Sequence, residues 1–239
     1  MKWSEFNNTC KEYFSNPGST WFHREINLRE AKVIAFVANS LGLSPNMLTL
    51  ISTLSAVAAM VAILLRPNDW RFGVLSLLLL QLCYISDCSD GILARFQNRS
   101  SKFGAFLDIF LDRFNNFVVL GVFGFVWAMN SSSKPSLISI AIYISAASAY
   151  ILYTIAAMQR GFIFPDLRGT MQNYGKSWKE KILKFPYEFM SMGVHFFLLS
   201  LSYIVGLIYP MVIFYGILGG LMTIAMIAYL YHKDADKRV

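Results

Sequence analysis

Cysteine, histidine and charged residues are scarce in this 239-residue chain. It has three cysteines, three histidines and 15% charged residues. Because Cys10, Cys83 and Cys88 form an odd set without paired spacing, we expect neither a disulfide framework nor a cysteine-based metal site. The first residues lack the early apolar core and cleavage pattern of a signal peptide, so we do not expect one. The chain also lacks a basic, aromatic-interleaved motif, so we expect no nucleic-acid partner.

Apolar residues, by contrast, are abundant. They make up 56% of the chain, and the mean hydropathy is +0.48. Six apolar stretches come close to the roughly 20 residues that a helix needs to cross the hydrocarbon core. We therefore predict an all-α integral membrane protein with six transmembrane helices. These helices are expected at Leu48–Leu65, Phe72–Ala94, Gly104–Met129, Leu137–Met158, about Phe189–Ile208 and Met211–Tyr231.

A shorter helical pattern precedes the first span. Asn27 followed by Glu30 is typical of a helix start, and Gly42 of a helix end. The apolar run at 31–38 is interrupted by Lys32 and is too short to span a bilayer. We predict an N-terminal interfacial amphipathic helix lying on the membrane, with a soluble cap helix as the alternative. The expected division is a cytoplasmic or interfacial segment at 1–46, a six-helix transmembrane domain at 47–231 and a cytoplasmic tail at 232–239.

The basic residues indicate the orientation. Seventeen of the 21 Lys and Arg residues lie on one side of the six spans, in the N-terminal segment, in 95–103, in 159–188 and in the tail. Since cytoplasmic segments carry an excess of Lys and Arg, both termini are expected in the cytoplasm. The net charge of +7 fits basic segments that face an anionic leaflet. We expect a multi-pass protein of a bacterial inner membrane.

Four aspartates stand where the second span ends and the third begins: Asp87, Asp90, Asp108 and Asp112. On helices, the first pair shares a face with Gly91 and Ala94, and the second pair shares a face with Gly104. Burying a carboxylate at membrane depth costs several kcal/mol, so four together require a counter-charge. An all-oxygen ligand set suits Mg²⁺ or Mn²⁺, whereas zinc would require a matched His or Cys set. Arg95 and Arg99, just beyond, indicate a ligand that carries phosphate.

The stretch resembles the signature of the CDP-alcohol phosphotransferase family, D-x2-D-G-x2-A-R-x8-G-x3-D-x3-D. All eight fixed positions are met, by Asp87, Asp90, Gly91, Ala94, Arg95, Gly104, Asp108 and Asp112. Eight fixed residues at fixed spacing make the resemblance highly specific. Pro45 and Asn46, followed by Thr49, also resemble a short motif that often opens the first span in this family.

The resemblance implies a membrane transferase. The expected reaction moves a substituted phosphate group, in the preferred interpretation phosphatidyl from CDP-diacylglycerol, to an alcohol hydroxyl and releases CMP, in phospholipid or related polar-lipid synthesis. The alternative within the family is transfer of a head group from a CDP-alcohol to a lipid acceptor. By resemblance, Asp87, Asp90 and Asp108 bind two divalent ions, Mg²⁺ or Mn²⁺, while Asp112 takes the acceptor proton and also contacts a metal. The implied donor-binding residues are Asn46, Asp90, Gly91, Ala94, Arg95 and Gly104.

The acceptor is less defined. Arg160 and Arg168 flank the inner end of the fourth span and are the candidates for binding a phosphate on the acceptor. Four lysines between 176 and 184 are interpreted as an ordinary basic loop. Asp112 followed by Arg113 resembles family members that use inositol phosphates. The arginine-rich end of the fourth span found in several such relatives is not reproduced in this sequence, so the acceptor stays open.

A cation transporter is the competing function class, because intramembrane carboxylates also mark cation pathways. A transporter would need acidic residues near the bilayer midplane with access to both sides, whereas these aspartates cluster toward one face. We therefore favour the enzyme. Small residues on two later spans suit close helix contacts and a homodimer. They are Ala146, Ala147, Ser148, Gly219 and Gly220.

Overall fold

The computed structural model describes residues 3–14, 28–67, 69–130, 134–163, 186 and 189–236. Every regular element in these ranges is an α-helix. In chain order the eight helices are α1 (Trp3–Phe14), α2 (Leu28–Ser40), α3 (Pro45–Leu65), α4 (Trp70–Phe96), α5 (Lys102–Asn130), α6 (Leu137–Ile163), α8 (Met192–Ile204) and α9 (Ile208–Asp236). The all-α class predicted from the sequence is confirmed.

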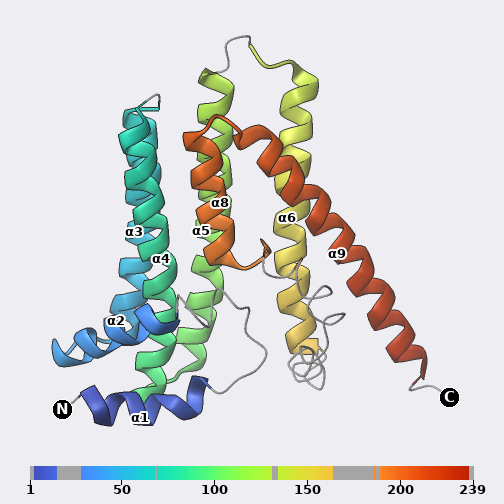
Figure 1. Ribbon diagram of the computed structural model, residues 1–239. Helices are drawn as coiled ribbons and strands as arrows, with labels where there is room; N and C mark the ends of the chain where they lie inside the picture. The colour runs from blue at the N-terminus through green and yellow to red at the C-terminus, as the bar shows by residue number, and fades with distance from the viewer. Residues whose placement is uncertain are drawn as a thin grey trace.

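Five of these helices are long and apolar enough to cross a membrane, namely α3, α4, α5, α6 and α9. Figure 1 shows α3 to α6 running up or down the view in nearly the same direction, with α9 crossing at a steeper tilt. The five helices correspond to the predicted first, second, third, fourth and sixth spans. The integral membrane fold is therefore confirmed.

The predicted fifth span is shorter than expected. Its helix, α8, has 13 residues, which is about 20 Å of helix and less than the hydrocarbon thickness of a bilayer. The helix stops because Gly206 adopts a left-handed conformation with φ of 77°, and the Leu207 amide then donates back to the Ser202 carbonyl at 2.6 Å. α9 begins directly afterwards, with Pro210 in its first turn, where an amide hydrogen is not needed.

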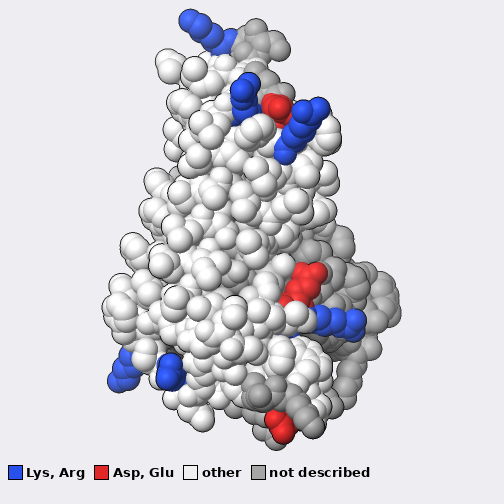
Figure 2. Space-filling view, turned by 90° about the vertical axis from the view of Figure 1, so that its left-hand side faces the viewer, with Lys and Arg blue, Asp and Glu red and all other residues white. Residues whose placement is uncertain are grey.

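Side chains are sorted by polarity along the bundle. On the described part of the face in Figure 2, Lys and Arg lie toward the two ends, and a broad zone without them separates the two groups. Large apolar side chains of the spans point outward in between, as Leu54 and Leu78 do with 56% and 60% exposed. Lipid contact accounts for such exposure, which would be unfavourable in water.

α1 and α2 lie at the end of the bundle where α4 ends and α5 begins, at a large angle to the spans (Figure 1). α2 confirms the short helix predicted before the first span. It buries Ala31, Ala35 and Ala38, and it leaves Val33 and Val37 about half exposed, at 51% and 48%. An apolar face that points away from the protein at this level fits a helix at the membrane interface.

The sequence pattern does not predict α1. Phe6 of this helix is fully buried. Its ring centroid lies 5.6 Å from that of Phe36 on α2 and 4.7 Å from that of Phe96 at the end of α4. These contacts dock α1 against the end of the helix that carries the first two aspartates of the signature.

Large apolar side chains fill the interior between the spans, and they include Ile63, Leu80, Phe123, Leu199 and Tyr215. α3 packs along α4, and α6 packs along α9. α6 and α9 approach closely at Gly216, where an added side-chain carbon would lie 2.5 Å from the Cα atom of Ala146. A carbon added to Gly219 would likewise lie 3.1 Å from the Cα atom of Tyr150. Some of the small residues that suggested a homodimer therefore serve packing within the chain.

Candidate functional site

A tight reversal joins the two helices that carry the four aspartates. Just after α4, Asn98 adopts a positive φ of 53°, and the Arg99 amide donates to the Ala94 carbonyl at 2.9 Å. Ser101 then caps α5, because its Oγ atom accepts from the Gly104 amide at 2.9 Å. The short turn reverses the chain, so that α4 and α5 run in opposite directions (Figure 1). The eight residues between Arg95 and Gly104 in the signature therefore contain this reversal.

The reversal brings the aspartates of both helices together. One carboxylate oxygen from each of Asp87, Asp90 and Asp108 lies within 4.8 Å of the other two. Asp112, one turn further along α5, lies against the Asp87 carboxylate and within the electrostatic field of Asp108. The two helices thus build the four-carboxylate group that the spacing predicts. We call these four residues the acidic cluster.

The acidic cluster fits a hard divalent cation. Oxygens within 4.8 Å of one another can converge on one ion, because such cations bind each oxygen at about 2.0–2.6 Å. Asp90 is 7% exposed, so water does not screen its charge well, and carboxylates this close repel one another without a cation between them. The Oδ1 atom of Asp112 is buried and has no hydrogen-bond partner within the described residues, which leaves it available to a cation or an acceptor.

α3 supports the acidic cluster through Thr49. The Thr49 hydroxyl donates a hydrogen bond to Oδ2 of Asp90. Further along the same helix, the Ser52 hydroxyl lies 3.3 Å from the sulfur of Cys83 on α4, and Asn115 Nδ2 on α5 lies 3.8 Å from that sulfur. Polar contacts therefore tie α3, α4 and α5 together beside the cluster. The sequence shows Thr49 only as part of a short motif and does not predict its hydrogen bond to Asp90.

The predicted donor-binding residues gather around the same end of α4 and α5. A side-chain carbon added to Gly91 would lie 3.6 Å from the Arg95 guanidinium, and one added to Gly104 would lie 3.8 Å from Oδ1 of Asn46. Asn46 and Arg95 are exposed, while Gly91 and Gly104 are partly exposed. The residues from α3, α4 and α5 thus border a surface that is open next to the acidic cluster. Ala94, one turn after Asp90 on α4, is also partly exposed.

The predicted acceptor residues lie mostly outside the described part of the chain. Arg160 belongs to the last turn of α6, but its side chain lies outside the described part of the chain, and so does all of Arg168. Arg113 follows Asp112 in the pair that resembles family members using inositol phosphates. It is half-buried on α5, and its charge acts on the carboxylates of Asp108 and Asp112. Its position directly after Asp112, inside an apolar run, is the signal that marks it.

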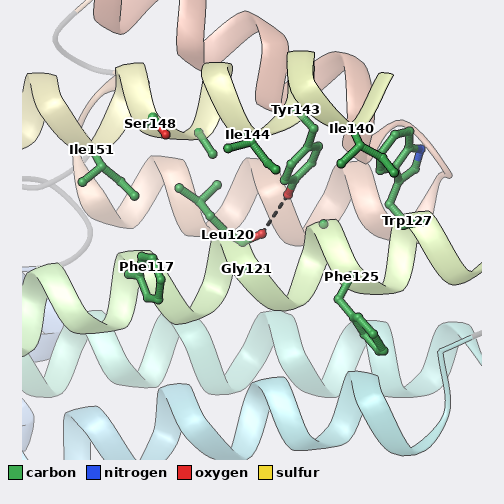
Figure 3. Close-up of a pocket in the computed structure, with 13 residues that line it drawn as sticks. Phe117, Leu120, Gly121, Phe125, Trp127, Ile140, Tyr143, Ile144, Ser148 and Ile151 are labelled. Carbon is green, nitrogen blue, oxygen red and sulfur yellow. Dashed lines mark hydrogen bonds between the residues drawn. The ribbon is translucent and has the colours of Figure 1, made fainter. Parts of the chain in front are cut away.

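An apolar groove runs between α5 and α6, beyond the acidic cluster (Figure 3). Its volume is about 330 Å³, and no charged residue is among the thirteen described residues that line it. Figure 3 shows the Tyr143 hydroxyl at the groove, donating to the Leu120 carbonyl at 2.8 Å. The groove therefore has no group suited to a metal or a phosphate, and the acidic cluster is the site of chemical interest.

Comparison with known proteins connects this site to a family. Residues 42–230 match the family model described as CDP-alcohol phosphatidyltransferase. The chain is 34% identical over 159 residues to an archaetidylinositol phosphate synthase of Aeropyrum pernix, an alignment that covers 64% of this chain and 68% of that protein. It is 31% identical over 115 residues to a phosphatidylinositol phosphate synthase of Streptomyces avermitilis, which covers 48% of this chain and 45% of that protein.

The family match covers most of the chain and includes every residue of the acidic cluster. It agrees with the eight-position signature that the sequence displays. Family members transfer substituted phosphate groups in lipid synthesis, which is a reaction that a group of carboxylates able to hold divalent metal can support. The chain therefore belongs to the CDP-alcohol phosphatidyltransferase family and is a membrane enzyme of that class.

Proposed function

We propose that this enzyme transfers a phosphatidyl group from CDP-diacylglycerol to the hydroxyl group of an alcohol and releases CMP. The observation that carries the proposal is the convergence of Asp87, Asp90 and Asp108 within 4.8 Å of one another, one helical turn from Asp112. Gly91 has room beside it, with the Arg95 guanidinium nearby. The acidic cluster, with free space and the Arg95 guanidinium next to it, suits a diphosphate that binds together with divalent ions.

The transfer forms one bond and breaks one. The acceptor oxygen attacks the phosphorus that carries the diacylglycerol, the bond from this phosphorus to the bridging diphosphate oxygen breaks, and CMP leaves with the bonding electrons. The acceptor proton passes to Asp112, which acts as the general base. Two features support this role. Asp112 lies next to Asp87 and Asp108, and its buried Oδ1 atom has no partner in the described part of the chain.

The remaining aspartates are the proposed metal ligands. Asp87, Asp90 and Asp108, with Asp112 as a shared ligand, would hold two divalent cations, Mg²⁺ or Mn²⁺. When bound, these ions neutralise the diphosphate and polarise the phosphorus under attack. Thr49 orients Asp90 for this task by holding one of its oxygens. The proposed donor-binding residues are Asn46, Asp90, Gly91, Ala94, Arg95 and Gly104.

A phosphorylated acceptor is the first class to test. The names of both relatives describe synthases of inositol phosphate lipids, and Arg113 places a cation directly beside the proposed base. Guanidinium groups bind phosphate well because they offer several donors in a fixed plane. Inositol phosphate is therefore the proposed acceptor, with Arg160 and Arg168 as further contacts for its phosphate.

We place the enzyme in a bacterial cell membrane with the acidic cluster facing the cytoplasm. The excess of Lys and Arg on that side supports this orientation. A homodimer is the proposed assembly. Ala147 and Ser148 of α6 support it, because these small residues are at least partly exposed and allow a second helix to approach closely.

The decisive experiment measures CMP release by the purified protein in lipid nanodiscs with Mg²⁺ or Mn²⁺. CDP-diacylglycerol is paired with phosphorylated and unphosphorylated polyols, and CDP-alcohols are paired with diacylglycerol. Acceptor-dependent release from CDP-diacylglycerol that disappears in Asp112→Asn supports the proposal. Release from the CDP-alcohols alone would mean that the enzyme transfers a head group from a CDP-alcohol to a lipid acceptor. The absence of both CMP release and donor binding would overturn the proposed reaction.

A further inference from the structure

Tyr150 on α6 is held between two aromatic rings. Its ring stacks on that of His195 with centroids 4.1 Å apart and an interplanar angle of 10°, and it meets the ring of Tyr215 nearly edge-on at 5.5 Å. His195 and Tyr215 also contact each other at 4.4 Å. All three residues are buried, with at most 1% exposed. Because these contacts come from α6, α8 and α9, the Tyr150 ring is fixed in one orientation.

His195 holds Tyr150 by stacking rather than by hydrogen bonding. Neither of its ring nitrogens has a hydrogen-bond partner within the described residues. The stacked, near-parallel arrangement places the face of the imidazole, not its polar edge, against the tyrosine. The aromatic neighbours therefore orient Tyr150 without occupying its hydroxyl group.

The register of α5 and α6 places Tyr150 at the level of the proposed base. The two helices run in opposite directions (Figure 1), and the Tyr143 hydroxyl donates to the Leu120 carbonyl at 2.8 Å (Figure 3). Arg113 precedes Leu120 by seven residues. Tyr150 follows Tyr143 by seven, so both lie about 10 Å further toward the same end of the bundle. The charges of Arg113 and Asp112 accordingly act on the Tyr150 hydroxyl.

Arg113 is a cation within a membrane span, and its Nε atom is buried without a hydrogen-bond partner in the part of the chain that is described. A charged side chain at such depth is costly and calls for a counter-charge. Asp108 and Asp112 are near enough to supply part of this counter-charge. Both belong to the acidic cluster, however, and divalent cations bound there would compensate their charge. An anionic substrate group beside Arg113 would supply the remaining counter-charge.

We propose that Tyr150 and Arg113 form the acceptor side of the active site. The Tyr150 hydroxyl hydrogen-bonds the acceptor, and Arg113 binds an anionic group on it, so that the reacting hydroxyl faces Asp112. The acceptor is then a small polyol that carries a phosphate and binds between Arg113 on α5 and Tyr150 on α6, on the side of the apolar groove that faces the acidic cluster. This inference rests on the proposed function, and it adds binding residues that the sequence signature does not contain.

The test compares two tyrosine variants of the same helix. Tyr150→Phe removes one oxygen and keeps the stacked ring, so the KM for the phosphorylated acceptor should rise about tenfold, with the donor KM and the Tm unchanged. Tyr143→Phe is the control, because it removes the hydroxyl bound to the Leu120 carbonyl. That variant should lower the Tm and leave the acceptor KM as in the wild type.

Arg113→Gln provides the second, independent measurement. Loss of the guanidinium should raise the KM of the phosphorylated acceptor by about tenfold or more, because hydrogen bonds to charged groups are the stronger class. An active wild type with the same acceptor KM in Tyr150→Phe and Arg113→Gln would overturn this inference alone. A wild type that releases no CMP from any donor and acceptor pair would overturn the proposed function, and the inference with it.

Discussion

The hydroxyl group of Thr49 on α3 donates a hydrogen bond to Oδ2 of Asp90 on α4, across 41 residues of sequence. Both side chains are buried. A carboxylate held by one oxygen is restricted in its rotation, which fixes the direction of the oxygen that it offers to a cation. α3 therefore takes part in building the acidic cluster although it contributes no carboxylate.

Thr49→Val is expected to weaken divalent cation binding. Valine keeps the shape of threonine but removes the donor, so Asp90 loses its fixed orientation. Changes to residues that orient a metal ligand typically cost about 10–100-fold in metal affinity. Titration of the purified protein with Mn²⁺, followed by electron paramagnetic resonance, measures this affinity without relying on turnover.

Thr53→Val is the control for that experiment. Thr53 lies one turn further along α3, and its buried hydroxyl has no hydrogen-bond partner among the described residues. Removing it should leave Mn²⁺ affinity unchanged. Equal Mn²⁺ affinity in Thr49→Val and Thr53→Val would show that the hydrogen bond to Asp90 does not orient a metal ligand.

Asp112→Asn is expected to separate donor binding from turnover. Asparagine keeps the size of aspartate but cannot take the acceptor proton, so kcat should fall by about 10²–10⁴-fold. Binding of the CDP donor should persist, because Asp87, Asp90 and Asp108 remain. Steady-state CMP release and calorimetric donor binding measure the two quantities on the same preparation.

The control for Asp112→Asn is Asp69→Asn at the opposite end of α4. Asp69 caps this helix through a 3.0 Å hydrogen bond from the Arg71 amide to its Oδ1 atom, and asparagine caps helices equally well. Its CMP release should match the wild type. A kcat for Asp112→Asn close to that of Asp69→Asn would exclude Asp112 as the base.

Most of the bundle could be predicted because membrane spans depend on apolar length, which is a local property of the sequence. The spacing of the aspartates likewise determines which of them share a helical face, and the signature placed both faces at one reversal. Apolar length and spacing do not predict α1 or the short length of α8. α1 is held by Phe6 against Phe36 and Phe96, and α8 ends because Gly206 adopts a positive φ inside a continuous apolar run.

Side-chain contacts between distant segments could not be predicted for the same reason. Two contacts depend on which faces of separate helices meet. One is the hydrogen bond from Thr49 to Asp90, and the other is the packing of His195 and Tyr215 against Tyr150. Helical spacing assigns residues to faces, but it does not pair the faces of different helices. The acidic cluster was accessible to prediction because its two helices are joined by a short turn.

Gly91→Ala is expected to weaken donor binding while leaving the protein stable. The added carbon would lie 3.6 Å from the nearest described atom, on the flexible Arg95 side chain, so the free protein can accommodate it. If the diphosphate packs against this glycine, the same carbon overfills the complex, and donor affinity should fall about tenfold or more. Calorimetry with a CDP-linked donor and Mg²⁺ measures the change.

Gly220→Ala serves as the control for Gly91→Ala, since it adds the same carbon to a helix where no described atom lies within 4 Å. Donor affinity should be that of the wild type. Unchanged affinity in Gly91→Ala as well would mean that the donor does not contact this face of α4, and the donor-binding role of Gly91 would be wrong.

Gly216→Ala is expected to destabilise the contact between α6 and α9. The added carbon would lie 2.5 Å from the Cα and Cβ atoms of Ala146, so the two helices must separate. Overfilling a packed interior typically costs about 1–3 kcal/mol, whereas Gly220→Ala adds its carbon to open space and gains about 0.5–1 kcal/mol from helix propensity. Thermal unfolding in detergent should therefore give a lower Tm for Gly216→Ala and an equal or higher one for Gly220→Ala. The same Tm in both variants would contradict the close approach of α6 and α9, and with it the packing that holds Tyr150 in place.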